Sequence, residues 1–389
     1  MFRISGGHSL CPCMRTYEAT HPWITFRWEP RRAPYPLWLL LGEAAALVRT
    51  LEKQPLLPDQ NSIREEVNLI QGIQAMAAME GNTLTVDQVG DVLRGRQRLA
   101  ASQAYLGTQV DNLRKCIRWN VERVRSGERH FTPASLQQLH AQVLKGLTLE
   151  GDDAPGEFRT TDDRAESGGG IPVQDVPHAV ERLCAWLDAE RFLPEHAEER
   201  GAFALVRPFI AQLYLLWIRP FAEGNGRVAW LVTHQLLMEA GASPALALLV
   251  APKTAMVHHR HGREVKAATT GAGDPLPFLA YMVRLLVEGL QEEVALRQAM
   301  QREALGQLFV DQAFHDAPGP VTQRRRALLE ALRHCPEPVP VERIPHLSPR
   351  LAATFARLDR KTLQRDIAFL MEEGLVAREG RGVAVRIGI

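Results

Sequence analysis

The sequence predicts a mainly α-helical protein that ends in a winged helix-turn-helix, and three observations lead to this prediction. Apolar residues recur at helical spacing through most of the 389 residues, as at Leu136, Leu139 and Val143. Sequence signals for helix ends flank these apolar segments. Near the C-terminus, three helical patterns precede an alternating pattern around a glycine-containing turn, which is typical of a β-hairpin.

The composition is that of an ordinary folded protein. Hydrophobic residues make up 46% and charged residues 23%, and 46 Lys+Arg against 45 Asp+Glu leave a net charge of +1. This balance excludes a uniformly basic nucleic-acid coat and an acidic tail. The most apolar stretch, residues 203–221, is interrupted by Arg207, Arg219 and two prolines, so no membrane partner is expected. The five cysteines are odd in number and scattered, which favours a reducing cytoplasm.

Four regions are expected along the chain. Residues 1–14 are expected to be a disordered leader, and residues 15–125 an N-terminal helical region. Residues 126–315 are expected to form a helical core with the long helix that follows it, and residues 316–389 a winged helix-turn-helix. The last region differs in charge, because residues 322–389 hold thirteen Lys/Arg and eight Asp/Glu, a net charge of +5.

Local signals mark several elements within these regions. Thr85 and Gln88 form a capping box, and Thr132-Pro133 places an N-cap before a proline at the first helical position. Asp175 is the expected N-cap of another helix. A long helix is expected over about 275–310. Residues 151–172 are rich in glycine and acids, which predicts a mobile loop or a short hairpin.

The most informative stretch is RPFAEGNGR at residues 219–227. An apolar helix is expected to end just before it, near Ile218, and another to follow over 228–240. The stretch therefore reads as a tight turn between two buried helices. Such a turn alone needs no ligand, but an acid followed by Gly-Asn-Gly-Arg is a more specific pattern.

The residue types in this turn suit a diphosphate and a magnesium ion. Gly224 and Gly226 let the backbone turn tightly, and with Asn225 between them their amides would point outward at a helix N-terminus. A helix N-terminus carries partial positive charge and unpaired N–H groups, which favour anions. Arg227 offers a fork of donors for phosphate oxygens, and Glu223 is a suitable ligand for Mg²⁺ that bridges phosphates. These five residues predict nucleotide binding.

The stretch resembles the signature of the Fic (Fic/Doc) family, His-Pro-Phe-x-(Asp/Glu)-Gly-Asn-Gly-Arg-x-x-Arg. Residues 17–24 (YEATHPWI) are similar to the opening of Fic proteins that carry a C-terminal winged helix, and residues 77–84 (AAMEGNTL) to their inhibitory-helix motif. Residues 155–159 (PGEFR) resemble the stretch before the family's target-binding flap. The resemblance covers nearly everything after about residue 14.

The resemblance implies a fold and an activity. The expected fold is a Fic-type helical bundle with a short β-hairpin flap, followed by the winged helix-turn-helix. The expected activity is transfer of AMP from ATP–Mg²⁺ to a Ser, Thr or Tyr hydroxyl of a target protein. The expected ligands are therefore Mg²⁺ and ATP, or another nucleotide.

Two signature positions depart from the family. Arg219 stands where the family has its catalytic histidine, and a guanidinium stays protonated, so it cannot act as the base. Losing such a base typically lowers the rate by about 10²–10⁴. Trp230 replaces the second signature arginine, which in the family holds the γ-phosphate. The expectation is a weakened or diverted enzyme, with a catalytically inactive sensor of nucleotides or other phosphate ligands as the alternative.

Further residues keep two interpretations open. Arg219 is either a surface arginine that compensates an acid or an additional phosphate clamp. By resemblance Glu80 is the inhibitory glutamate, but it could equally be a solvated residue between a helix over 65–79 and the helix stop at Gly81. His258, His259 and His261 are expected to form a solvated cluster, and a replacement base or a metal site is the alternative.

The C-terminal module suggests a second binding surface. Helices are expected over 322–332, 341–355 and 359–373, followed by the hairpin. The third helix should bury its apolar residues and present four polar residues for DNA: Arg360, Lys361, Gln364 and Arg365. A module that binds another protein, or that forms a homodimer, is the alternative and needs no DNA.

Overall fold

The computed structural model describes residues 15–96, 99–128, 131–148, 154–162, 170–188, 192, 196–270, 273–314, 319–335, 337–380 and 382–385. The leader expected at residues 1–14 lies outside these ranges. The chain divides into two compact units, Met1–Val294 and Ala295–Ile389.

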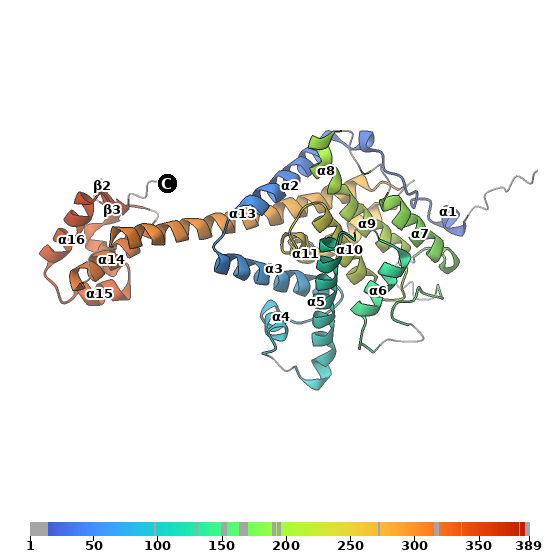
Figure 1. Cartoon of the computed structure of the whole chain (residues 1–389), viewed down its shortest axis with the longest axis horizontal. Helices are drawn as coiled ribbons and strands as arrows, with labels where there is room; N and C mark the ends of the chain where they lie inside the picture. The colour runs from blue at the N-terminus through green and yellow to red at the C-terminus, as the bar shows by residue number, and fades with distance from the viewer. Residues whose placement is uncertain are drawn as a thin grey trace, which may run out of the picture. The chain divides into compact units, whose positions relative to one another are not determined.

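The first unit is built from helices (Figure 1). Its helices are α1 (Thr16–Thr20), α2 (Tyr35–Lys53), α3 (Pro58–Ala78), α4 (Val86–Leu93), α5 (Ala104–Arg125), α6 (Pro133–Val143), α7 (Val176–Leu187), α8 (Arg200–Ala204), α9 (Val206–Ile218), α10 (Asn225–Glu239), α11 (Val250–Met256), α12 (His258–Ala267) and the first part of α13 (Leu276–Ala313). The prediction of a mainly α-helical protein is confirmed.

Helices α9 and α10 form the centre of this unit. Both are buried along almost their whole length, as expected for helices that are apolar all round. They pack against each other, α10 also packs against α5 and α6, and α7 packs against α9. By length and composition, the helical stretch Ala197–Ile218 could cross a membrane, but 67% of its most apolar window is buried inside the unit. This apolar helical stretch is longer than the two arginines within residues 203–221 suggested.

The local signals for helix ends have mixed outcomes. The capping box of Thr85 and Gln88 is present at the start of α4, and Thr132 caps α6 through the backbone N–H of Ser135. Asp175 lies just before α7, but its side chain does not cap that helix. Its carboxylate accepts a hydrogen bond from the backbone N–H of Tyr17 at 2.8 Å instead. Asp175 thus bonds to Tyr17, far away in the sequence, and makes no capping hydrogen bond to α7.

The β-hairpin flap expected within 151–172 is not observed where the structure describes it. Residues 154–162 and 170–172 contain turns and bends and no strand, and residues 163–169 lie outside the described ranges. The physical reason is that the backbone N–H of Arg159 donates to the carbonyl of Pro220, so the segment pairs with the turn between α9 and α10.

The second unit contains the last part of α13, three further helices and a small sheet. Its elements are α14 (Pro320–Arg333), β1 (Val339–Pro340), α15 (Pro349–Phe355), α16 (Arg360–Glu372), β2 (Val376–Glu379) and β3 (Gly382–Val385). The strands are antiparallel in the order β1-β3-β2, with Val376 opposite Val385 and Val339 opposite Val383. The expected hairpin is present, and β1 adds a strand that the sequence did not predict.

The helix expected over 341–355 is divided. Residues Val341–His346 form a 3-10 helix that contains Pro345, and α15 begins only at Pro349. Ser348 ends the break, because its side chain accepts a hydrogen bond from the backbone N–H of Leu351. The two prolines disfavour a continuous α-helix here.

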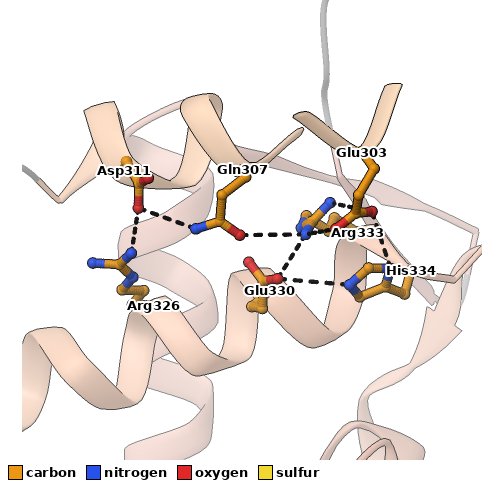
Figure 2. A network of polar contacts seen from close by, with 7 residues as sticks. All are labelled: Glu303, Gln307, Asp311, Arg326, Glu330, Arg333 and His334. Carbon is orange, nitrogen blue, oxygen red and sulfur yellow. Dashed lines mark hydrogen bonds and ion pairs between the residues drawn. The ribbon is translucent and has the colours of Figure 1, made fainter. Parts of the chain in front are cut away.

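The boundary between the units differs from the expected position at residues 315 and 316. The second unit begins at Ala295, inside α13, and Val310 of that helix lies in its core. Figure 2 shows why: the last part of α13 is joined to α14 by ion pairs. Arg333 contacts Glu303 and Glu330, and Arg326 contacts Asp311. The last part of α13 therefore belongs to the second unit.

A buried carboxylate holds α14 against α16. The Asp366 side chain is 1% exposed and accepts hydrogen bonds from Arg324 at 2.6 and 3.1 Å and from Arg325 at 2.9 Å. Breaking a buried pair on one side is costly, because the remaining charge loses its partner.

We therefore expect Asp366→Asn to lower the free energy of unfolding of the second unit by about 3 kcal/mol, because both arginines lose a charged partner. The control is Asp311→Asn, since the Asp311–Arg326 pair is 46% and 47% exposed. That change should cost about 0.5 kcal/mol or less.

The two units can be followed separately in the full-length protein. The last of the seven tryptophans is Trp230, so tryptophan fluorescence reports only the first unit, whereas circular dichroism reports both. Asp366→Asn should shift part of the dichroism transition in urea and leave the fluorescence midpoint unchanged. Equal effects of the two substitutions would contradict a structural role for the buried pair.

Candidate functional site

The turn after α9 begins with a strained backbone at Arg219. This residue ends α9 in the left-handed conformation, with φ 49° and ψ 67°, which typically costs a non-glycine residue about 1–3 kcal/mol. Two hydrogen bonds hold it there. Its N–H donates to the carbonyl of Leu215 at 2.9 Å, and its carbonyl accepts from Nε of Arg159 at 2.8 Å. Both bonds use main-chain atoms of Arg219, so its side chain does not define the turn.

The side chain of Asn225 closes the turn. Its Oδ1 accepts a hydrogen bond from the N–H of Phe221 at 3.0 Å, and its Nδ2 donates to the carbonyl of Phe221 at 2.7 Å. A carboxylate could not make the second bond, because it has no hydrogen to donate. The sequence predicted that the backbone amides of this turn face a phosphate, and it did not predict this structural role of the Asn225 side chain.

Helix α10 begins at Asn225, three residues earlier than the sequence indicated. Gly224 precedes it with φ 72°, and no side chain of the described residues caps the helix N-terminus. The first-turn N–H groups of a helix have no partner within the helix. Gly224, Asn225 and Gly226 line a cavity of about 980 Å³. The expected anion-binding end of a helix therefore opens into a cavity.

His140 contacts this turn, and no prediction from the sequence included it. Its ring stacks on Phe221 with 3.8 Å between the ring centroids. Nδ1 accepts a hydrogen bond from the N–H of Gly156, and Nε2 lies 3.1 Å from the carbonyl oxygen of Glu223 and donates to it. Burial lowers the pKa of His140 to about 4, so the ring is neutral at pH 7. With both nitrogens engaged, it positions the turn and is not an available base. Its spacing in α6 carried no functional signal.

Arg227 is a buried cation with unused donors. The residue is 7% exposed, and its Nε and Nη1 have no hydrogen-bond partner among the described residues. Its Nε lies 4.0 Å from a carboxylate oxygen of Glu80. Buried polar groups are nearly always hydrogen-bonded, so unused guanidinium donors beside a helix N-terminus indicate a place for an anion.

Glu80 points into this place. The residue follows α3, and a Cβ atom added at Gly226 would lie 2.0 Å from its Oε1. Burial raises the pKa of Glu80, Arg227 and Arg219 oppose the rise, and Glu223 adds to it. Although 29% of the side chain remains exposed, the carboxylate lies against the first turn of α10. Of the two interpretations of Glu80, the structure therefore favours the one in which it occupies the cavity.

Trp230 lies one turn further along α10 and also lines the cavity. Its ring centroid is 6.0 Å from that of His261, which is buried near Phe278 and Tyr281. Burial, with a smaller effect of His258, lowers the pKa of His261 to about 4. His261 was expected to be solvated, and that expectation is wrong. The spacing of His261, Val265 and Ala268 on one face of α12 was the missed signal.

His258 and His259 are exposed, as expected. The three histidines therefore differ in exposure. His258 and His261 both line the cavity, but His258 is exposed and His261 is buried.

Gln212 is a further cavity residue that the sequence analysis missed. It lies in α9 and is fully buried, and both polar atoms of its side chain have no hydrogen-bond partner in the described parts of the chain. The available signal was an amide within the mainly apolar helix α9. Together with Trp217 and Trp230, Gln212 gives the cavity a neutral, partly aromatic part of its wall.

Arg219 and Glu223 complete the site. Glu223 lines the large cavity, while Arg219 lines both that cavity and a smaller one of about 240 Å³ that Arg159 and Asp162 also line. The structure thus brings Glu80, Arg219 and the residues of 223–227 together. The four residues expected to contact DNA belong to the second unit, where they are exposed on α16.

Comparisons with known proteins show what this chain is similar to. Residues 130–237 match the model of the Fic/DOC family. Over 221 residues the chain is 26% identical to a protein adenylyltransferase Fic of Culex quinquefasciatus, which covers 56% of this chain and 40% of that protein. A protein adenylyltransferase Fic of Drosophila grimshawi is 27% identical over 216 residues, 54% of this chain and 40% of that protein. The chain thus spans about two fifths of the length of these relatives.

Solved structures share the fold. A Fic family protein from Desulfovibrio desulfuricans G20 has a TM-score of 0.55 and 22% identity, over 93% of this chain and 99% of that one. Fic-1 (residues 134–508) from C. elegans has a TM-score of 0.56 and 18% identity, over 68% of this chain and 74% of that one. The chain therefore carries a Fic/DOC family domain at residues 130–237, built around the turn and the cavity described above.

Proposed function

We propose that the cavity binds a nucleotide with Mg²⁺ and that the chain is a Fic-type protein adenylyltransferase whose activity is weakened at Arg219. One observation carries this proposal: the uncapped N-terminus of α10 opens into the cavity beside the unused donors of Arg227. The relatives named protein adenylyltransferase Fic support the choice of reaction, at low identity.

The residues present fit both parts of the ligand. Arg227 and the first-turn N–H groups of α10 suit phosphate oxygens. Mg²⁺ is usually held by one or two carboxylates together with substrate phosphates and water, so Glu223 alone is a sufficient protein ligand. When bound, the ion neutralises phosphate charge and orients the phosphates. The neutral wall that includes Gln212 and Trp230 suits an uncharged part of the ligand.

The reaction needs a base that Arg219 does not supply. In AMP transfer, a target hydroxyl oxygen bonds to the α-phosphorus, pyrophosphate leaves, and the hydroxyl proton must be removed. A guanidinium cannot accept this proton. The site would therefore bind and orient the donor and the acceptor while proton removal falls to water, which makes the transfer slow.

We expect Arg219→His to raise transfer of labelled AMP from ATP–Mg²⁺ onto the protein itself by about 10²-fold or more, because the imidazole restores a base. Histidine also tolerates the left-handed backbone at this position better than most residues. The measurement is the initial rate of self-labelling of the full-length chain.

Glu223→Ala in the Arg219→His background should abolish this labelling, because the residue proposed to hold Mg²⁺ is lost. Glu288→Ala is the matched control, since Glu288 is exposed on α13 and does not line the cavity. Labelling that persists without Glu223 would count against the proposed metal ligand.

An inactive sensor of phosphate ligands is the second candidate. The observation that favours it is the coincidence of three features in one cavity: Arg219 at the base position, Trp230 in place of an arginine, and the carboxylate of Glu80 against Gly226. Binding of ATP by the wild type, with self-labelling only in Arg219→His, would favour the sensor. Labelling in the wild type that Glu223→Ala abolishes would favour the enzyme.

We expect Glu80→Gly to bind ATP–Mg²⁺ about tenfold more tightly than the wild type, a gain of about 1.4 kcal/mol. The carboxylate of Glu80 competes with phosphate for space and by charge, and both effects disappear in this variant. Calorimetry measures the affinity. Glu80→Gln keeps the volume and removes the charge, so its affinity should lie between the two. An unchanged affinity in Glu80→Gly would refute a gating role.

The pH dependence of binding should follow the same side chain. The pKa of Glu80 is raised, so the carboxylate becomes neutral at a less acidic pH than an exposed glutamate would. Below this pKa the repulsion of phosphate is relieved, and above it the repulsion is present. The affinity of the wild type for ATP should therefore fall as pH rises through the pKa of Glu80. Glu80→Gln should lack this fall, and it also corrects for titration of the ligand.

A further inference from the structure

The arginines of α14 are occupied within the second unit. Arg324 and Arg325 contact the buried Asp366. Arg326 contacts Asp311, and Arg333 contacts Glu303 and Glu330 (Figure 2). Arg324, Arg325 and Arg333 are mostly buried by these contacts, whereas the Arg326 pair is half exposed. All four cations thus have an acidic partner within the unit.

The seven cations among the described residues after α14 are exposed and lie on different elements. They lie on the 3-10 helix before α15, on α15, in the turn before α16, on α16 and on β2. They are Arg343, Arg350, Arg357, Arg360, Lys361, Arg365 and Arg378. In the described part of the unit, Arg360 is the one member of this set with an ion pair, to Glu342 at 3.6 Å. Because both side chains are more than 70% exposed, this pair contributes little.

Helix α16 is polarised in two directions. Across the helix, Leu363, Asp366, Ile367 and Leu370 are buried, while Arg360, Lys361, Gln364 and Arg365 are exposed. Along the helix, the exposed cations lie in the N-terminal half, and Glu372 and Glu373 lie at the C-terminal end. The helix dipole adds positive potential at the N-terminal half, which Asp359 caps.

The order of elements matches a known way of presenting such a helix. Helices α14, α15 and α16 are followed by the β2–β3 hairpin, and β1 pairs with β3 on the far side from β2. Only residues 356–359 separate α15 from α16. In a winged helix-turn-helix, the helix after this short turn lies in the DNA major groove and the hairpin contacts the backbone.

We propose that the second unit binds double-stranded DNA through the exposed face of α16. Arg360, Lys361 and Arg365 contact phosphates or guanine edges, and Gln364 reads a base edge. Arg378 on β2 contacts the backbone beside the groove.

Charge complementarity favours duplex DNA over two other occupants. A protein interface has a core that is depleted of charged residues, whereas residues 360–365 present three cations and a glutamine. The major groove of double-stranded RNA is too narrow and deep to admit a helix. The B-form major groove admits one.

The test is binding of the full-length protein to a fluorescent mixed-sequence DNA duplex, followed by anisotropy across a series of salt concentrations. The logarithm of the binding constant should fall linearly with the logarithm of the salt concentration. Lys361→Ala and Arg365→Ala should each weaken binding about five- to tenfold at 0.1 M salt and reduce the magnitude of the slope by about 1.

The matched control is Arg302→Ala, which removes the same charge from an exposed position on α13 in the same unit and should change neither quantity. Absence of binding at low salt would overturn the proposal. So would equal losses in the control and in the α16 variants, because binding would then depend on net charge alone. Tighter binding to a single-stranded RNA of equal length would overturn it as well.

Discussion

The side-chain amide of Asn225 is the interaction on which the site depends. By both donating to and accepting from the backbone of Phe221, it fixes the turn between the two central helices. This turn determines where α10 begins and therefore the direction of the unpaired N–H groups at its N-terminus. It also brings Arg227 into the interior, where its guanidinium keeps unused donors. The cavity is the space that this arrangement leaves beside the helix.

Three side chains in or beside the cavity have unsatisfied polar atoms. Arg227, Gln212 and His261 each keep at least one buried side-chain atom without a hydrogen-bond partner among the described residues. Buried polar groups are usually hydrogen-bonded, so a ligand with matching polar groups would satisfy them. Glu80 partly compensates, since its carboxylate places a negative charge where an anion would lie. The carboxylate of Glu80 and a bound phosphate would therefore compete for the same place.

The sequence predicted what depends on neighbouring residues and failed where distant segments meet. The capping box of Thr85 and Gln88 and the N-cap at Thr132 were foreseen because they involve residues close together in the sequence. Asp175 was misassigned because its partner, Tyr17, lies 158 residues away. The expected flap pairs with the motif turn through Arg159, and the end of α13 joins the second core through contacts with α14, neither of which periodicity can reveal. In the site, the charged turn was foreseen from its motif, whereas Gln212 and His261 needed the packing of α9, α10 and α12.

The left-handed residue at the start of the turn has a consequence for substitutions at this position. The N–H of Arg219 donates to the carbonyl of Leu215, and its carbonyl accepts from the side-chain Nε of Arg159, so both bonds use main-chain atoms at position 219. Any residue other than proline could make the same two bonds. A substitution here can therefore change the side chain that lines the cavity while these bonds still form.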